Sequence, residues 1–463
     1  MKGTSKSFRI GRVRGDLRGK VWYLTYHDNG TRHRPRVGPD REAARQLAAQ
    51  INSQLEVGVP TALAFSPIAI AELQSRWLGQ HEHVLCSSVQ TIDRYRTATN
   101  HLLRFLDSTH LTLKTSQFGS HHAERFARYL RTVQVTPNGH PNAEHRPLLD
   151  KGVKYVLLTC RSMFNYAIKR RHLPPYTENP FSILDLDRIP VENSRPISLF
   201  TPDQERKFLE ACDDWQLPMF LTLMLTGLRP GELTHLLLPD DVDLDGLLLR
   251  VRNKPRLGWQ VKTRSERDIP IVKPLAAVLK VCIGKRATGP LFLRRRFNTH
   301  DSPTLCGAST STLELELAKR VATWEREHDG SIARHELRAI ARTLWRDAGA
   351  IETKRLRMEF MRLTKRIGQP DATAPKSLRH LFATSLQEGD VDPLIRCELM
   401  GHSTRASSGA THGLGMTATY THTRLETKRR QLESALSARP AVSVAKRWFE
   451  RKKVKTGHGV GVT

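Results

Sequence analysis

The segment Thr226-Gly227-Leu228-Arg229-Pro230-Gly231-Glu232-Leu233 follows the longest apolar run of this 463-residue chain, Leu217 to Leu225. That run is broken by a proline and a threonine and is too short to span a bilayer, so it predicts an apolar helix of a folded domain. The glycines after it permit a tight turn and the close approach of a bulky ligand to the backbone. Arg229 therefore stands where a ligand can reach it, although an arginine at such a turn is by itself more often a surface residue.

Three further regions downstream carry charged or nucleophilic side chains. They are Val261-Lys262-Thr263 on an expected hairpin, Lys376-Ser377-Leu378-Arg379-His380, and Leu399-Met400-Gly401-His402-Ser403 with the later Thr419-Tyr420-Thr421-His422. Each is weak evidence alone, because a hairpin Lys is usually solvated, Gly-His usually marks a helix boundary and a lone Tyr is usually core. Their combination in this order along the chain is far more specific.

Taken in that order, the segments resemble the signature of the tyrosine recombinases, the phage-integrase family. The signature joins an Arg in a Thr-Gly-x-Arg-x-x-Glu-Leu context, a hairpin Lys, a His/Lys-x-x-Arg box, a Leu-Leu-Gly-His box and a nucleophilic Tyr. The resemblance spans nearly the whole chain and is strongest between Thr226 and His422. It implies an enzyme that cuts and rejoins DNA without ATP, metal or another cofactor, and in which Glu232 orients Arg229 or its helix.

The resemblance implies a role for each matching residue. Arg229 and Arg379 would offer bidentate donors to the non-bridging phosphate oxygens, and Lys262 would protonate the leaving 5′ oxygen. His402 would hydrogen-bond the phosphate and assist proton movement, while Tyr420 would attack and form a 3′-phosphotyrosyl intermediate. That bond keeps the energy needed for rejoining, because the phenolate is a moderate leaving group.

Two features depart from the family pattern. Lys376 stands where the family usually has His, and a cation there still serves the phosphate. His402 and Tyr420 are 18 residues apart, which is longer than is usual in the family, because a segment rich in Ser, Gly and Ala lies between residues 406 and 416. Tyr420 remains the expected nucleophile, since no other Tyr follows it, and the sequence leaves open whether it is delivered in cis or from a swapped helix.

The expected fold is multidomain and mainly α, with small β elements. Residues 1–58 predict a small β-sheet plus one helix, and the resemblance makes them a basic arm-type DNA-binding domain. Residues 66–171 predict a helical core-binding bundle, 172–200 form a proline-rich linker, and 201–436 form a mixed α/β, mostly α, catalytic domain. Residues 437–463 are expected to be a basic C-terminal tail that is mobile at its end.

Two predictions concern the first half of the chain. Up to Arg41, eleven Lys or Arg stand against three Asp, and Val21 to Tyr26 predicts a strand. We interpret Trp22, Tyr23 and Tyr26 as a surface that docks into a DNA groove; the alternative is that they pack on the following helix. Apolar stripes at helical spacing predict four helices within residues 66–171.

In the catalytic domain, Thr201-Pro202-Asp203-Gln204 predicts a capped helix start, with Thr at N-cap, Pro at N1 and Gln at N3. The segment from 298 to 375 is longer than the minimal family pattern and predicts structural helices. Short strands are expected before it, at residues 247–251, 260–262 and 268–272.

The charge of the chain indicates its partner. Lys plus Arg number 74 and Asp plus Glu 46, and a net charge of +28 attracts polyanions. Double-stranded DNA is the partner that the family resemblance implies, and the resemblance also implies a homotetramer that works on two duplexes, with a possible DNA-bending accessory protein. Oligomerisation is expected to use the segment after Tyr420, where Leu425, Leu432 and Leu436 would dock on a neighbour.

Cysteine and histidine usage bears on location and metal binding. Six cysteines without any Cys-x-x-Cys pair are typical of reduced thiols in a cytosolic protein. No stretch is apolar enough for a membrane span or a secretory signal, so we expect a cytoplasmic, nucleoid-associated protein with no membrane partner. The 20 histidines lack partners at ligand spacing, so no metal site is expected.

The function expected from these features is a site-specific recombinase or integrase that integrates and excises a phage or mobile element. Two alternatives stay open: a DNA-binding relic of the family that has lost catalysis, and a type IB topoisomerase-like enzyme that relaxes DNA. Covalent capture of DNA distinguishes them, since a relic never becomes linked to DNA and a topoisomerase is linked at dispersed sites.

Overall fold

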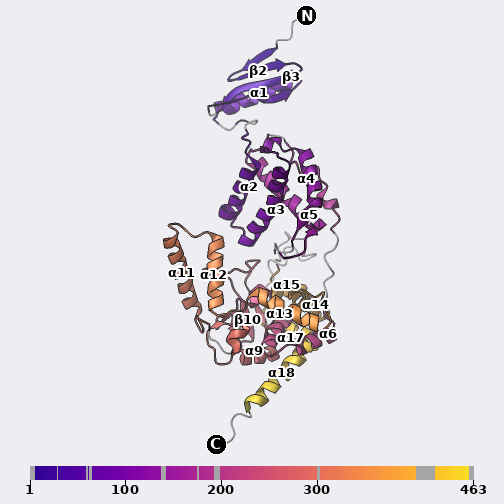
Figure 1. Ribbon diagram of the computed structural model, residues 1–463, viewed down its shortest axis with the longest axis vertical. Helices are drawn as coiled ribbons and strands as arrows, with labels where there is room; N and C mark the ends of the chain where they lie inside the picture. Colours follow the sequence, from indigo (N-terminus) through magenta and orange to yellow (C-terminus); the bar gives the residue numbers. More distant parts are fainter. Residues whose placement is uncertain are drawn as a thin grey trace. The chain divides into compact units, whose positions relative to one another are not determined.

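The computed structural model divides the chain into two compact units, Met1–Arg195 and Pro196–Thr463 (Figure 1). Both units are mainly helical and carry small antiparallel sheets, so the expected fold class is confirmed. The structure describes residues 6–28, 30–58, 61, 65–136, 142–174, 177–191, 199–299, 303–402 and 423–457.

A five-stranded antiparallel sheet and one helix begin the first unit. Leu24 and Tyr26 on the central strand β3 (Val21–Asp28) pack with Ala48 and Ile51 of helix α1 (Arg41–Glu56). The remaining strands are β1 (Ser7–Ile10), β2 (Val13–Arg18), β4 (Thr31–His33) and β5 (Arg36–Gly38).

The interpretation of the β3 aromatic residues as a groove-docking surface is wrong for two of the three. Trp22 and Tyr26 are 3% and 1% exposed, because side chains alternate between the faces of a strand and both lie on the core face. Tyr23 lies on the other face and is partly exposed, with the Arg34 guanidinium 5.9 Å from its ring centroid.

Four helices form the expected bundle in the rest of the first unit. Their apolar stripes meet in one core, where the rings of Phe118, Phe164 and Phe181 are in contact. The helices are α2 (Ile70–Gly79), α3 (Val89–Ser108), α4 (Ser120–Thr132) and α5 (Asp150–Lys169). Short elements between and after them are η1 (Gln80–Val84), η2 (Thr115–Gln117), β6 (Gln134–Val135), β7 (Arg146–Pro147) and η4 (Leu186–Arg188).

The second unit opens with helix α6 (Pro202–Glu210), which is capped as predicted. Thr201 Oγ1 accepts the Gln204 N–H at 3.3 Å, and the Gln204 side chain accepts the Thr201 N–H at 2.9 Å. Helix α7 (Gln216–Thr226) is buried along its whole length, as its apolar sequence predicts. It forms the middle of the core of this unit and packs against α9 (Lys273–Ile283) and α14 (Lys376–Glu388).

Two small antiparallel sheets lie beside this helical core. Strands β9 (Val242–Asp243), β10 (Leu248–Val251) and β11 (Arg267–Pro270) form one, and β8 (Leu237–Leu238) pairs with β12 (Gly289–Pro290) in the other.

The strand expected at residues 260–262 is wrong. The chain turns at η5 (Pro255–Leu257) and at Gly258, whose φ of 65° is left-handed, and only Trp259 bridges back to Lys254. Residues 260–262 continue from that bridge as irregular backbone and enter a turn.

The long segment before α14 is helical, as expected. Helices α11 (Thr310–Glu327) and α12 (Arg334–Asp347) form a hairpin that projects from the unit (Figure 1). Its apolar residues form a small core together with Leu237 and Leu257. Two more helices, α10 (Arg295–Thr299) and α13 (Thr353–Arg366), precede and follow this hairpin.

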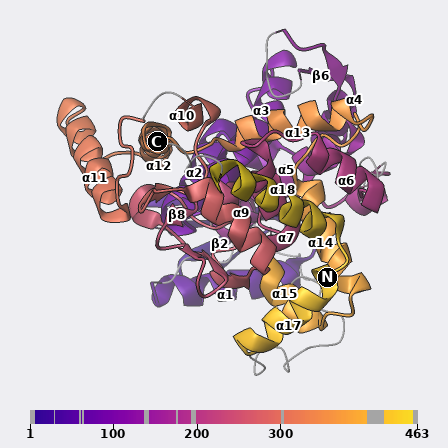
Figure 2. The ribbon, with the colours of Figure 1, turned by 90° about the horizontal axis from the view of Figure 1, so that it is seen from below.

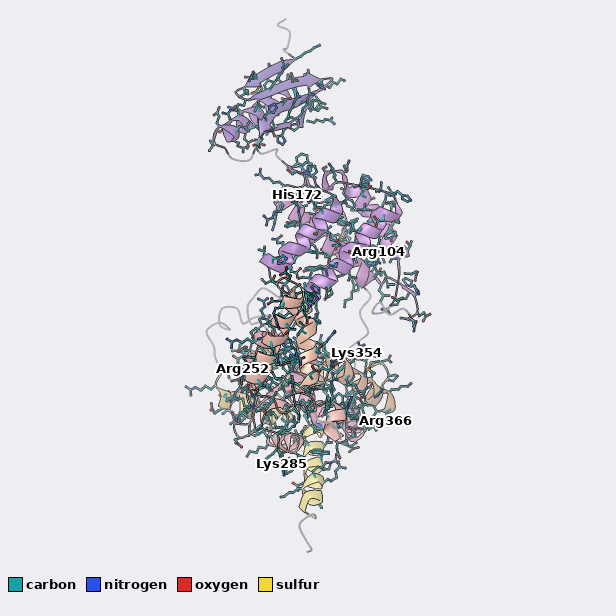
Figure 3. All side chains as sticks on the ribbon, turned by 60° about the vertical axis from the view of Figure 1, so that its left-hand side comes forward. Arg104, His172, Arg252, Lys285, Lys354 and Arg366 are labelled. Carbon is teal, nitrogen blue, oxygen red and sulfur yellow. The ribbon has the colours of Figure 1, made fainter. Side chains whose placement is uncertain are left out.

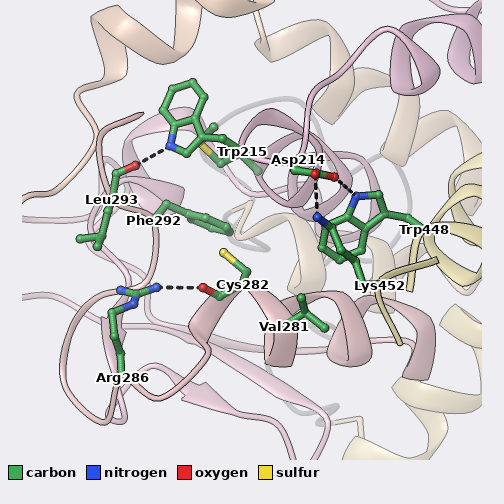
Figure 4. A pocket seen from close by; sticks show the side chains of 10 residues that line it. Asp214, Trp215, Val281, Cys282, Arg286, Phe292, Leu293, Trp448 and Lys452 are labelled. Atoms are coloured by element: carbon green, nitrogen blue, oxygen red, sulfur yellow. Dashed lines mark hydrogen bonds and ion pairs between the residues drawn. The ribbon is translucent and has the colours of Figure 1, made fainter. Parts of the chain in front are cut away.

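Much of the expected C-terminal tail, residues 437–463, is helix α18 (Pro440–Gly457), which packs against α6 and α9 (Figure 2). The indole N–H of Trp448 donates to Asp214 at 2.8 Å, and the Lys452 ammonium pairs with the same carboxylate at 2.6 Å (Figure 4). Charge dominates the composition of this segment, but its apolar residues recur at helical spacing. Those buried are Ala441, Val442, Val444, Ala445 and Trp448.

Helix α17 (Leu425–Leu436) corrects the expectation about oligomerisation. Leu432 and Leu436 are buried in the core of their own chain, where α17 packs against α14, so they are not free to dock on a neighbour. Leu425 stays partly exposed. Helices α8 (Pro230–Leu233) and α15 (Pro393–Met400) complete the unit.

Basic side chains are found on both units. Figure 3 labels Arg104 on the bundle of the first unit and Arg252, Lys285, Lys354 and Arg366 on the second. None of the helices in the described parts of the chain combines the length and apolar character that crossing a membrane requires.

Candidate active site

Arg229 is placed by the abrupt end of helix α7. Gly227 ends that helix in a left-handed conformation (φ 62°), and a Cβ on it would lie 2.3 Å from the Phe382 ring of α14. Only glycine therefore allows α14 to approach the turn this closely. The chain then restarts as α8, with Arg229 at its N-cap, and the Glu232 carboxylate accepts the Arg229 N–H at 2.8 Å.

Glu232 is the buried anion around which the site is organised. Its carboxylate accepts hydrogen bonds from the guanidinium of Arg229 at 2.8 Å and from that of Arg267 at 2.7 and 3.1 Å. Burial alone raises the pKa of Glu232, but the hydrogen bonds and charge of Arg267, followed by the hydrogen bonds from Arg229, outweigh it and lower the pKa. The carboxylate is therefore ionised, and it orients Arg229 as the sequence suggests.

Arg379 lies on the first turn of α14 and is 4% exposed. Its guanidinium donates to the Gly227 carbonyl at 2.6 Å and to the Met400 carbonyl, and lies 3.4 Å from His402 Nε2. Burial, and then the charges of Arg229 and Arg267, lower the pKa of Arg379 to about 9. The charge of Glu232 acts in the opposite direction and only partly offsets these effects, so the side chain is charged at neutral pH in a net positive surrounding.

His402 directly follows the end of α15. Gly401 closes that helix in a left-handed conformation (φ 59°), and its carbonyl accepts from Arg229 at 3.4 Å. Burial lowers the pKa of His402, and the charges of Arg379, Arg229, Arg267 and Lys376 lower it further. The imidazole is therefore neutral at pH 7, which leaves it one N–H donor and one acceptor nitrogen.

Lys376 begins α14, one helical turn before Arg379, and is exposed. Its charge contributes to lowering the pKa of both His402 and His380, so it lies within electrostatic reach of the site. A hollow between α14 and α15 opens beside these residues and is lined by His380, His402 and Met400, among others.

Two of the expected site residues are not brought to this group. Lys262 lies exposed in a turn, and its ammonium makes no hydrogen bond or ion pair with any described residue. Tyr420 lies outside the described residues.

Arg267 is a site residue that sequence reasoning missed. It begins strand β11, and besides its two bonds to Glu232 it donates from Nε to the Leu399 carbonyl at 2.9 Å. The available signal was strand alternation, which places Arg267 on the same inward face as the buried Ile269. An arginine at an inward position of a strand needs a buried anion, and Glu232 supplies it.

The arginine cluster, defined as Arg229, Arg267 and Arg379 with Glu232, has three guanidinium groups and one carboxylate, which bonds to Arg229 and Arg267. The remaining charge is positive, and Lys376 adds to it. Planar donors in this number fit an oxyanion with several oxygens, such as a phosphodiester, better than a second carboxylate partner. The fold and the site thus define a phosphate-binding protein with a neutral histidine at hand.

Comparison with known families agrees with this class. Residues 198–427 match the model of the phage integrase family, which includes the whole arginine cluster and the residues through Tyr420. The chain therefore belongs to the phage integrase family, and it is a DNA recombinase that cleaves and rejoins strands.

Solved structures with similar chains include a lambda integrase tetramer bound to a Holliday junction, at 17% identity and a TM-score of 0.47, covering 84% of this chain and 91% of that one. The Tn1549 transposon integrase with circular intermediate DNA gives 16% identity and a TM-score of 0.45, with 80% and 99% covered. The XerA recombinase gives 18% identity and a TM-score of 0.30, with 78% and 96% covered. No curated protein matched the chain.

Proposed function

We propose that this recombinase is the integrase of a phage or other mobile element and that it works through a 3′-phosphotyrosyl intermediate on Tyr420. The observation that supports this most is the arginine cluster, in which Glu232 holds Arg229 and Arg267 by hydrogen bonds, while Arg379 bonds to backbone carbonyls. A site built from buried cations without enough anions is prepared for a charge that arrives with the substrate, here a DNA phosphate.

The proposed cleavage step balances one bond made against one broken. The Tyr420 oxygen attacks the phosphorus, a phosphotyrosyl bond forms at the 3′ end, and the bond from phosphorus to the 5′ oxygen breaks. Arg229 and Arg379 stabilise the charge on the non-bridging oxygens, with Lys376 adding to the field. His402, neutral at pH 7, offers its acceptor nitrogen to the phenol proton, and Lys262 gives a proton to the leaving 5′ oxygen.

Rejoining reverses these steps with a different 5′-hydroxyl. That hydroxyl attacks the phosphotyrosyl phosphorus and releases Tyr420, so two rounds exchange two duplexes. The number of phosphoester bonds is unchanged throughout, and we expect the reaction to need no energy-rich cofactor.

We further propose that a homotetramer acts on two DNA duplexes in the cytoplasm, with residues 1–58 as an arm-type domain, residues 66–171 as a core-binding domain, and a DNA-bending protein as an optional partner. The net charge of +28 supports DNA binding, and one similar structure is a tetramer on a Holliday junction. Because phosphate contacts release counterions, affinity should fall steeply as salt rises.

The test is covalent capture of DNA. The protein is expressed in its native host, the lysate is denatured, the protein is recovered and any attached DNA is sequenced. We expect adducts at one or a few sites, absent in Tyr420→Phe and kept in the matched control Tyr129→Phe, a tyrosine of the bundle in the first unit.

Each other outcome has a defined meaning. Tight DNA binding without adducts in any variant would favour the catalytically impaired relic. Adducts dispersed over the genome would favour a topoisomerase-like enzyme. Adducts that persist in Tyr420→Phe would remove Tyr420 as the nucleophile.

A further inference from the structure

Three aromatic side chains form a cluster that includes a residue of the loop leading to Lys262. This aromatic cluster consists of His235, Trp259 and Trp345. The His235 and Trp259 rings are stacked with centroids 4.9 Å apart, and Trp345 meets His235 edge-on at 4.6 Å. His235 is tied to helix α8, because its Nδ1–H donates to the Gly231 carbonyl at 2.7 Å.

The α11–α12 hairpin also contacts this loop. The Trp345 indole N–H donates to the carbonyl of Leu257, a fully buried residue, at 3.0 Å. Next to it, Gly258 faces α12 so closely that a Cβ on the glycine would lie 2.5 Å from Ala341 Cβ. The hairpin therefore fixes the loop just before Trp259, three residues ahead of Lys262.

The loop is also pinned on either side of Lys262. Asn253 Oδ1 accepts the Val261 N–H at 2.9 Å, and its Nδ2 donates to the Arg264 carbonyl at 3.1 Å. Val261 is 2% exposed, and its carbonyl accepts the Arg264 N–H at 2.8 Å. Residues 261–264, the Lys262 turn, thus keep a defined backbone although the Lys262 side chain is exposed.

The Lys262 turn is connected to the arginine cluster by a short stretch of chain. Arg267 of the cluster is five residues beyond Lys262, and five extended residues span at most about 18 Å, so the two backbone positions cannot lie farther apart than that. A small displacement of the turn would change where the Lys262 ammonium lies relative to a phosphate held by the cluster. Misplacement of a catalytic group by about 1 Å can cost about 10²-fold in rate.

We propose that the α11–α12 hairpin positions the general acid. Through Trp345 and the aromatic cluster, it holds the Lys262 turn in a fixed place relative to Arg229. Trp345 is then a positioning residue, and Lys262 is the group that touches the reacting atoms. This inference rests on the proposed function. It assigns a role to the helical segment that lengthens the chain between the β10–β11 sheet and α14.

A change of leaving group tests this proposal. Lys262 is needed because a 5′-alkoxide leaves poorly without a proton, so the ammonium gives its proton as the bond from phosphorus to the 5′ oxygen breaks. A 5′-bridging sulfur leaves as a thiolate, and thiols have a pKa of only about 8.5, so that substrate needs no general acid. The experiment measures single-turnover adduct formation on the recovered DNA site, made with either oxygen or sulfur at the scissile 5′ position.

For Trp345→Phe, which keeps a ring but removes the N–H donor, we expect cleavage of the oxygen substrate to slow about ten- to a hundredfold. The sulfur substrate should react at the wild-type rate, as it should with Lys262→Ala. Arg379→Ala should slow both substrates, because it acts on the phosphate. Trp324→Phe, the same substitution near the far end of α11, where Trp324 stacks on His328 at 4.1 Å, should change neither.

If Trp345→Phe slows cleavage of both substrates equally, or slows neither, the proposal is overturned. If Trp345→Phe does not fold, Ala341→Val is used instead, because it enlarges the α12 side chain that faces Gly258 and so displaces the loop. It should slow the oxygen substrate and leave the sulfur rate unchanged, and equal slowing of both would also overturn the proposal. The proposed function fails separately, since it does so if the wild type forms no Tyr420-dependent adduct on the oxygen substrate.

Discussion

Lys262 and Arg267 of the arginine cluster are only five positions apart in the chain, yet the Lys262 turn and the cluster are held in opposite ways. The cluster is buried and built on ionic contacts, with Glu232 2% and Arg267 5% exposed at their side chains. The Lys262 turn is held by backbone and amide hydrogen bonds and by packing of neutral rings, while the Lys262 ammonium makes no ion pair with a described residue. Under the proposed function, the groups that would bind the phosphate charge are fixed in advance, whereas the group that would give up a proton keeps its side chain free.

The largest effect should come from removing the central anion. Glu232→Gln removes the counter-ion of the partly buried Arg229 and the buried Arg267, so we expect the free energy of unfolding of the second unit to fall by about 3–5 kcal/mol. Urea unfolding measures this. Glu210→Gln, which breaks an exposed pair with Arg447, is the matched control and should cost less than about 1 kcal/mol. Equal losses would show that the cluster is not built around Glu232.

Next in size is the loss of the fixed guanidinium. Arg379→Lys keeps the charge but cannot bond two backbone carbonyls and a phosphate together, so adduct formation should slow about 10²–10³-fold. That equals about 2.7–4 kcal/mol of transition-state stabilisation. Rates are compared with Arg206→Lys, an exposed position on α6, and DNA binding is followed by gel shift. An Arg379→Lys rate within a few-fold of wild type would mean that charge alone suffices.

Burial of His235 in the aromatic cluster should make the free energy of unfolding depend on pH. Burial lowers the pKa of His235 to about 4, while the unfolded chain holds a histidine near its ordinary value of about 6.5. The unfolded state therefore binds the extra proton, and stability falls as pH drops from about 6.5 toward 4, by about 1.4 kcal/mol per pH unit. Between pH 7 and pH 5, His235→Gln should lose about 2 kcal/mol less than the wild type in urea unfolding.

His328→Gln, at an exposed position, is the control for that measurement and should track the wild type. If His235→Gln does so too, the ring is protonated in the folded protein and the aromatic cluster is more open than described.

The smallest expected effect is on stability when Lys262 is removed, and it tests most directly whether the Lys262 turn differs from the arginine cluster. Because the Lys262 side chain is exposed and makes no ion pair within the described residues, Lys262→Ala should change the free energy of unfolding by less than about 0.5 kcal/mol. Lys254→Ala, which removes a lysine buried in a 2.8 Å pair with Asp241, should cost several times more. A clear loss of stability in Lys262→Ala would mean that this lysine is part of the structure as well as of the chemistry.

Local signals in the sequence predicted those parts of the fold that local chemistry determines. The Thr201 capping box, the four bundle helices and the apolar α7 are each set by neighbouring residues, and each is confirmed. The prediction for the aromatic side chains of β3 failed because period-two alternation shows which residues share a face of the strand but not which face is buried. Trp22 and Tyr26 turned out to be inside.

The parts that were missed depend on partners far along the chain. Arg267 looked like any strand arginine, since its anion lies 35 residues earlier. Helix α18 looked like a basic tail, because the Asp214 that accepts from Trp448 lies 234 residues earlier. In the candidate site, the motifs located Arg229, Arg379 and His402, which the structure brings together, whereas the roles of Lys262, Lys376 and Tyr420 remain predictions.

Helix α18 also determines when the second unit can finish folding during synthesis. The Glu205 carboxylate of α6 accepts from Arg439 and from the Ala441 N–H at 2.9 Å, so the first helix of the second unit is completed by its last. A ribosome must therefore finish the helix at 440–457 before the buried face of α6 is closed. We expect the nascent chain to stay unable to cut DNA until α18 has been made and has packed on α6, which keeps a strand-breaking activity from arising before the second unit is folded.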